Sequence, residues 1–255
     1  MFYQTELQST ELVVGGMQAV ADTLAQQLGK KDVRLETPAL RVQQDKDSVI
    51  VIGQALAVKA RRVIIAVPPN LAARIEYEPS LPALKAQLLD RSPAGQGIKW
   101  HAVYPEPFWR NNGFTGQGAN LNEIAPQECL DCTPPEGKPG VLAGFAFGPT
   151  ARQLATLSIQ ERRQIWLNGL VKRFGSLAEQ PTYIDEYDWS TDTWARGDMF
   201  AHYAPGVLTG FGGALRVPCG RIHWAGTETA TIWSGSIEGA FRSGERAADE
   251  VSQQD

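Results

Sequence analysis

The sequence has no apolar run of the roughly 18 residues that a membrane-spanning helix requires. Its first residues, MFYQTELQST, contain neither the basic segment nor the apolar segment of a secretory signal. We therefore expect a soluble, cytoplasmic protein that has no membrane partner.

An excess of basic residues is also absent, because 24 Lys and Arg residues stand against 28 Asp and Glu residues and the net charge is −4. A nucleic-acid-binding protein needs a basic surface, so nucleic acid is excluded as a partner. The length of 255 residues and the hydrophobic content of 43% allow a sizeable core.

Cysteine is scarce, and the three cysteines are an odd number that suits a reducing compartment. Cys129 and Cys132 have the C-x-x-C spacing of zinc ligands, but a structural zinc site needs a second pair of ligands. Only Cys219 and three scattered histidines remain to supply that pair. We therefore predict no metal site.

The most informative segment that is present is RIHWAGTETATIWSGSIEGAFRSGER, residues 221–246. Residues 222–225 predict a buried strand and residues 226–229 a turn, and Gly235 is expected to be the hinge into a helix that ends near Ser252. Backbone that is nearly free of bulk can approach a flat anionic ligand closely. Apolar, mostly small residues recur along the helix at spacings of three and four, which predicts tight packing through this face: Ile237, Ala240, Phe241, Gly244, Ala247, Ala248 and Val251.

The remainder of the chain alternates short strands with a few helices. Gly29 is expected to end an amphipathic helix, and Ser158 with Glu161 forms a capping box that opens a helix running to Phe174 and ending at Gly175. A Gly- and Asn-rich connection at 111–122 is expected to be a mobile loop. The predicted helices are 17–28, 81–89 and 158–174, and the predicted strands are 33–35, 40–43, 49–52, 57–59, 62–67, 97–103, 141–147 and 182–188.

Residues 221–246 resemble the C-terminal flavin-binding signature of the flavin-containing amine oxidases, and the monoamine oxidases are the members that they resemble most. Five further segments look like segments of that family and occur in its order, so that the resemblance covers residues from about 10 to 252. These segments are VGGMQ from Val14, VIIAVPP from Val63, GIKWH from Gly97, EPFWR from Glu106 and PGVLT from Pro205.

The resemblance implies a mixed α+β and α/β fold. A glutathione-reductase-like FAD-binding domain, formed by residues 14–88 and 194–255, would be interleaved with a substrate domain at 89–193 that consists of an antiparallel sheet and helices. The FAD-binding domain is expected to be incomplete, because the sequence contains no full Gly-x-Gly-x-x-Gly turn for the pyrophosphate. The nearest matches, at 116–121 and 210–215, have leucine at the third glycine and are interpreted as loop glycines.

The resemblance also implies which residues bind FAD. Gly235, Ser236 and Ile237 would place the amides of a helix N-terminus beside the flavin oxygen. Lys99 matches a family lysine that holds a water against flavin N5, and it is the candidate catalytic residue. Further candidate contacts are Trp189 for the flavin ring, Ala39 for the adenine edge, and Gly226, Thr227 and Glu228 for the ribityl chain and phosphates.

Three positions depart from the monoamine oxidases. Asp198 stands where those enzymes have the cysteine that is joined to the flavin, so any FAD must be noncovalent. Met199 and Ser236 stand where two tyrosines flank the substrate amine, so they are the candidate substrate contacts and no aromatic cage is formed. Aromatic monoamines are therefore in doubt, and alkyl amines, diamines and polyamines are equally open.

The leading hypothesis is FAD-dependent oxidation of a small-molecule amine. Hydride would pass to flavin N5, water would hydrolyse the imine, and dioxygen would reoxidise the flavin and form peroxide. Activity would require the missing phosphate-binding segment in the same or another polypeptide, and we expect the isolated chain to lack FAD. The alternatives are a noncatalytic remnant or partner module that does not bind FAD, and a phytoene-desaturase-like flavoprotein, which fits the Lys99 region less well.

Overall fold

The computed structural model describes residues 13–29, 31–119 and 125–253. It divides into two compact units, Met1–Pro38 and Ala39–Asp255. The first unit contains α1 (Gln18–Leu28), which ends at Gly29 with φ 88°, so the prediction of a glycine-terminated helix is confirmed. The predicted strand at 33–35 is wrong, because these residues pair with no other strand of the described chain and Glu36 directly after them has φ 54°.

The second unit begins with a four-stranded sheet whose strand order is β3-β2-β1-β5. Strands β1, β2 and β3 form the predicted antiparallel meander, and β5 lies parallel to β1. The turn between β1 and β2 is fixed by Asp45, whose carboxylate accepts hydrogen bonds from the backbone amides of Asp47 and Ser48. The strands are β1 (Ala39–Gln44), β2 (Val49–Gly53), β3 (Ala57–Ala60) and β5 (Glu76–Glu78).

A separate pair of parallel strands joins distant parts of the chain: β4 (Val63–Ile65) and β13 (Ile222–Trp224). Strand β4 is shorter than the predicted 62–67, because the chain leaves the pair before Pro68 and starts α2 (Pro69–Ala72). Helix α3 (Ala83–Asp90) confirms the helix predicted at 81–89. A buried cluster unites these elements with the meander: Val42, Val49, Ile65, Ala72, Leu89, Cys219, Ile222 and Trp224.

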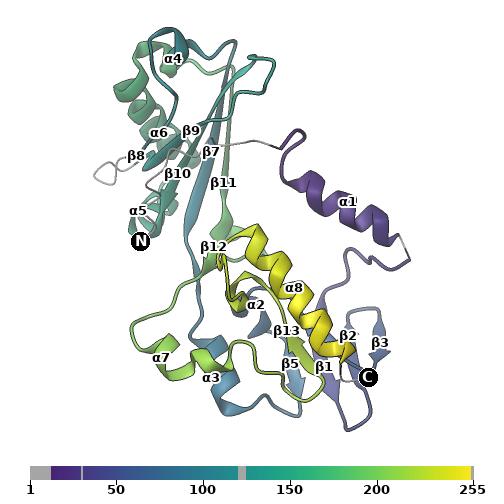
Figure 1. Ribbon diagram of the computed structural model, residues 1–255. Helices are drawn as coiled ribbons and strands as arrows, with labels where there is room; N and C mark the ends of the chain where they lie inside the picture. The colour runs from purple at the N-terminus through teal and green to yellow at the C-terminus, as the bar shows by residue number, and fades with distance from the viewer. Residues whose placement is uncertain (1–12, 30, 120–124, 254–255) are drawn as a thin grey trace. The chain divides into compact units, whose positions relative to one another are not determined.

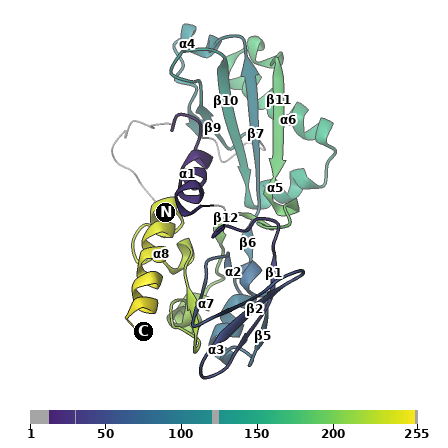
Figure 2. The same cartoon turned by 90° about the vertical axis from the view of Figure 1, so that its right-hand side faces the viewer.

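A five-stranded antiparallel sheet follows in the order β11-β7-β10-β9-β8. Helices α5 (Gly148–Ala155) and α6 (Ile159–Phe174) lie on one of its faces (Figures 1 and 2). The predicted capping box is present, and the buried residues Trp166, Leu170 and Phe174 of α6 pack into the core that also contains Trp100 and Leu142. The strands are β7 (Gly97–Tyr104), β8 (Gly118–Ala119), β9 (Glu128–Asp131), β10 (Gly140–Phe147) and β11 (Tyr183–Asp188).

Two expectations about glycine-rich segments need correction. The loop predicted at 111–122 contains β8, because Gly118 pairs with Cys129, and residues 120–122 lie outside the described residues. The glycines at 210–215 are not in a loop, since Gly210 lies in α7 (Val207–Phe211) and the next two lie in the 3-10 turn η3 (Gly212–Ala214). The remaining short elements are α4 (Phe108–Asn111), β6 (Ala94–Gly95), β12 (Asp198–Ala201), η1 (Ser176–Glu179), η2 (Trp189–Thr191) and η4 (Thr227–Thr229).

The C-terminal helix α8 (Ile237–Ser252) forms as predicted but packs through a different face. Its buried residues are Gly239, Ser243 and Ala247. A Cβ on Gly239 would overlap the carbonyl oxygen of Trp233, and the Ser243 hydroxyl accepts a hydrogen bond from the Gly226 amide at 2.9 Å. The opposite face of the helix is exposed. We call it the α8 stripe, and it consists of Ile237, Ala240, Phe241 and Ala248.

No helix in the described ranges is long and apolar enough to cross a bilayer.

Candidate functional site

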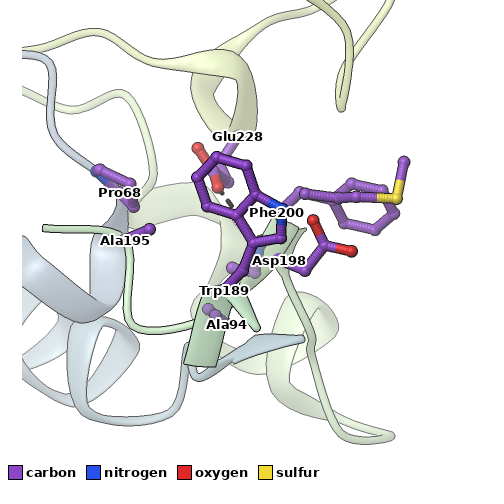
Figure 3. A pocket seen from close by; sticks show the side chains of 10 residues that line it. Pro68, Ala94, Trp189, Ala195, Asp198, Phe200 and Glu228 are labelled. Carbon is purple, nitrogen blue, oxygen red and sulfur yellow. Dashed lines mark hydrogen bonds between the residues drawn. The ribbon is translucent and has the colours of Figure 1, made fainter. Parts of the chain in front are cut away.

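A cavity of about 310 Å³ lies where the segment 189–201 passes Pro68 and the turn that contains Glu228. Figure 3 shows the side chains of Trp189, Asp198, Phe200 and Glu228 gathered around this space. The lining is mostly apolar and consists of Pro68, Ala94, Trp189, Ala195, Gly197, Asp198, Met199, Phe200, Ala201 and Glu228.

The backbone of this cavity is shaped by the pairing of β12 with β6. Asp198 pairs with Gly95 and Ala201 with Ala94, and the register shifts between these two pairs. Gly197 has φ 151°, and a Cβ there would overlap the Cβ of Ala94, so only glycine fits. The shift leaves Met199 in a left-handed conformation with φ 58° and with 67% of its surface exposed. Such a conformation in a bulky residue is typical of functional sites.

Asp198 connects the cavity to β7, which lies between β11 and β10 in the five-stranded sheet. A Cβ on Gly97 would overlap the Asp198 carboxylate, so this carboxylate rests against the backbone of β7. Burial raises the pKa of the Asp198 carboxyl, while a hydrogen bond from the Met199 amide and the Lys99 ammonium act in the opposite direction. The carboxyl therefore lies in a half-buried position where Lys99 is its nearby source of positive charge.

Lys99 lies on the sheet face opposite α6, because side chains alternate along β7 and its neighbours Ile98 and Trp100 are in the core. It is in register with Phe145 on one side and Tyr187 on the other. Its Nζ lies 5.3 Å from the centroid of the Phe145 ring. The Tyr187 ring contacts the Trp189 ring with centroids 4.7 Å apart, so this aromatic face continues to the cavity.

The turn after β13 is held together by Thr227. Its hydroxyl accepts a hydrogen bond from the Gly235 amide at 2.7 Å and donates to the Ser236 carbonyl at 2.9 Å. Ser236 caps α8, because its hydroxyl accepts from the Gly239 amide at 3.1 Å and donates to the Trp233 carbonyl at 2.6 Å. The amides of the first turn of α8 are thereby fixed in place, with Ile237 half exposed.

Two contacts join this turn to the cavity. Glu228 accepts a hydrogen bond from the Ala201 amide at 3.2 Å, and the Phe200 ring lies 3.2 Å from the position of a Cβ on Gly235. Gly226 with φ 111° and Gly235 with φ 84° adopt conformations that favour glycine, and they leave the backbone bare on both sides of the turn.

The structure therefore brings most of the predicted site residues together. Trp189, Asp198, Met199 and Glu228 line the cavity, and Gly226, Thr227, Gly235, Ser236 and Ile237 belong to the turn and helix beside it. Lys99 does not line the cavity, but its charge reaches Asp198. Ala39 is exposed at the first position of β1 and is not part of the cavity.

Several residues of this region were not predicted from the sequence. Phe145 and Tyr187 lie in the strands predicted at 141–147 and 182–188, but the sequence gave no order of strands that would place both beside Lys99. Ala94 and Phe200 gave no signal, since they meet only through the pairing of β12 with β6. Pro68 lies in a quoted segment, but nothing in that segment indicated that it lines a cavity.

The described part of the chain contains no group of three His, Cys, Asp or Glu side chains that could hold a metal ion. Cys129, Cys132 and Cys219 are all free thiols. The apolar cavity and the bare backbone turn instead suit a flat ring system, which can stack on an indole and accept hydrogen bonds from backbone amides.

Comparison with known proteins supports this interpretation. The family model for flavin-containing amine oxidoreductases matches residues 1–252. The chain is 38% identical to the L-amino acid dehydrogenase of Synechocystis sp. over 97% of its own length and 52% of that protein. It is 38% identical to human flavin-containing amine oxidase B over 93% of its length and 46% of that protein. The structure of cyclohexylamine oxidase from Brevibacterium oxydans matches with a TM-score of 0.90 and 36% identity over 94% of this chain and 53% of that one. The chain thus spans about half the length of the curated relatives it matches.

Proposed function

Because the chain belongs to the flavin-containing amine oxidoreductase family, we propose that it forms the substrate-binding portion and part of the FAD-binding portion of an amine-oxidising enzyme. One observation carries this proposal. The cavity lined by Trp189 and Asp198 meets both the sheet face that bears Lys99 and the glycine-flanked turn before α8. The domain division at 14–88 with 194–255 and 89–193 remains a prediction, as does the cytoplasmic location.

The residues present fit the ring end of FAD better than its phosphates. Trp189 offers an indole face at the cavity, and Gly226 and Gly235 place no side chains on the turn. The pyrophosphate would need a glycine-rich strand-to-helix turn, and the sequence has no complete one. We therefore propose that this turn comes from another segment of the same or a second polypeptide.

FAD, when bound, would accept a hydride from the carbon that bears the amine nitrogen and would be reoxidised by dioxygen. The chain's own contribution is positioning and electrostatics. Lys99 would hold a water molecule, the capped N-terminus of α8 would favour negative charge on the ring, and Asp198 rules out a thioether link, so the cofactor would be noncovalent.

We propose an alkyl amine, a diamine or a polyamine as the substrate. Met199 and Ser236 occupy the proposed positions beside the amine, and neither is aromatic. Putrescine oxidase of Kocuria rosea, which is 38% identical over 94% of this chain, is named for a diamine. Met199 is exposed beside the half-buried carboxyl groups of Asp198 and Glu228, and carboxyl groups in this position would attract the second ammonium group of a diamine or polyamine.

Two open surfaces support the proposal of a complementing polypeptide. Among the strands of the described chain, β4 and β13 pair only with each other, although parallel sheets are normally covered on both faces. The second open surface is the α8 stripe, which exposes Ile237 and Phe241 on the helix that follows β13. A strand from another segment would pair with the open edge of β4 or β13, and a helix from it would cover the α8 stripe.

The test is complementation. We expect the isolated chain to purify without the visible absorbance of flavin, and to retain FAD when it is co-expressed with the N-terminal half of Kocuria rosea putrescine oxidase. Peroxide release from putrescine would then report activity. If FAD is not retained with this half or with the corresponding half of the Synechocystis relative, the noncatalytic role replaces the proposal.

Replacement of Lys99 by methionine tests the catalytic assignment in the complemented enzyme. We expect flavin reduction or reoxidation to slow by about tenfold or more with FAD still bound, because the change removes a positioned donor and not a binding surface. Stopped-flow absorbance measures both half-reactions. Lys59→Met, at an exposed strand lysine on β3, is the control and should leave both rates unchanged. Equal rates for Lys99→Met and the control would contradict the assignment.

A further inference from the structure

A second cavity, of about 270 Å³, lies between the start of α3, helix α7 and the residues that follow η3. It shares no lining residue with the cavity of the proposed amine site. Lys85 is the one charged residue of its lining, and the other lining residues are apolar except for the Cys219 thiol: Pro82, Leu84, Gly210, Phe211, Gly213, Ala214, Val217, Pro218 and Cys219.

Lys85 is the unusual member of this wall, because only 3% of its surface is exposed. Its Nζ donates a hydrogen bond to the Leu215 carbonyl at 2.9 Å and lies 4.0 Å from the centroid of the Trp224 ring. No carboxylate in the described part of the chain forms an ion pair with it. Lys85 also lines a smaller neighbouring cavity together with Glu228, but that carboxylate accepts from the Ala201 amide.

A buried ammonium group without an anion is costly, because a carbonyl and an aromatic ring replace only part of its hydration. Burial accordingly lowers the pKa of Lys85 to about 8. The charge of Arg246 also lowers this pKa, while Cys219 acts in the opposite direction. An anion that reached the ammonium would recover electrostatic energy in surroundings of low polarity.

We propose that this second cavity binds a small monocarboxylic acid, whose apolar body fills the space beside Phe211 and Val217 and whose carboxylate pairs with Lys85. The inference is independent of the proposed amine oxidation.

The lining favours a carboxylate over a phosphate. Apart from Lys85, the wall has no arginine, serine, threonine or histidine side chain that could bind the additional oxygens of a phosphate. Burial also raises the pKa of the Cys219 thiol, so it remains neutral and does not compete for the ammonium. The volume is at the lower limit for small-molecule sites, which suits a single ring on a short chain.

Calorimetric titration with 4-phenylbutyrate and with its neutral analogue 4-phenylbutanamide tests the proposal on the full chain. We expect the acid to bind at least tenfold more tightly than the amide, because the amide has the same body and no charge. In Lys85→Met the two affinities should agree within about twofold. Lys172→Met, at an exposed lysine of α6, should retain the wild-type preference.

Gly213→Leu provides a second variant that keeps Lys85. A Cβ on Gly213 meets no atom within 4 Å, so a leucine can enter the cavity without disturbing the fold, and the acid should lose at least tenfold in affinity. Circular dichroism checks that both variants are folded. If Lys85→Met does not fold, the affinity of Gly213→Leu for the acid decides whether the proposal holds. The proposal is overturned if the wild type does not prefer the acid, if either folded variant keeps the preference and affinity, or if millimolar inorganic phosphate displaces the acid.

Discussion

Replacement of Glu186 by leucine should lower the free energy of unfolding by about 3–5 kcal/mol, which is the range for breaking one partner out of a buried ion pair. The Glu186 side chain is 3% exposed and that of Arg162 is 14% exposed. Glu186 accepts two hydrogen bonds from the Arg162 guanidinium, at 2.6 and 2.8 Å, and one from the Trp100 indole at 2.7 Å. Loss of the carboxylate leaves a buried cation and a buried N–H group without their acceptor.

Denaturant unfolding followed by circular dichroism measures this effect. The double replacement Arg162→Leu with Glu186→Leu should recover much of the loss, because no unpaired charge then remains in the core. Glu238→Leu breaks the exposed pair that Glu238 forms with Arg242 on α8 and should cost less than about 1 kcal/mol. A loss for Glu186→Leu no larger than that of this control would show that the buried pair contributes nothing specific.

Replacement of Gly169 by alanine should destabilise the protein by about 1–3 kcal/mol, although alanine is the better helix former. Gly169 lies in the middle of α6 on its buried face. A Cβ there would overlap the carbonyl oxygen of Ala125 and lie 2.7 Å from Cδ of Pro126. The obstacle is backbone and a rigid ring, so α6 and the segment at Ala125 and Pro126 would have to move apart.

Gly244→Ala is the matched control on α8, where a Cβ meets no atom within 4 Å. It should stabilise the protein by about 0.5–1 kcal/mol, because only the conformational entropy of glycine is removed. Thermal unfolding compares the two variants with the wild type. Equal shifts in the same direction would mean that α6 does not pack as closely as described.

The sequence predicted elements whose signals are local. The strand at 97–103 alternates inward and outward residues, and Ser158 with Glu161 marks the start of α6 within one helical turn. The prediction of which face of α8 is buried was wrong for a physical reason. Helical spacing reveals an apolar stripe, but the Ser243 hydroxyl that meets the Gly226 amide makes a tertiary contact without any sequence period.

The candidate site shows the same division between local and tertiary information. Asp198, Met199 and the turn at 226–229 were identified through resemblance to known motifs. Phe200 and Ala94 were not, because they line the cavity only after β12 has paired with β6. The second cavity had no signal at all, since Lys85 reads as an ordinary helix lysine until its burial against Trp224 is known.

The parallel pairing of β4 with β13 has a consequence for synthesis on the ribosome. The register joins Val63 to Ile222, and the whole five-stranded sheet lies in the chain between them. Chains emerge at roughly 5–20 residues per second, so β4 leaves the ribosome long before its partner exists. The strands of the sheet at 97–188 pair with strands that are closer in sequence, so this sheet can form before β13 is translated. Until Trp224 has been translated, the nascent chain carries an apolar strand with two open edges, which is the kind of segment that holding chaperones shield.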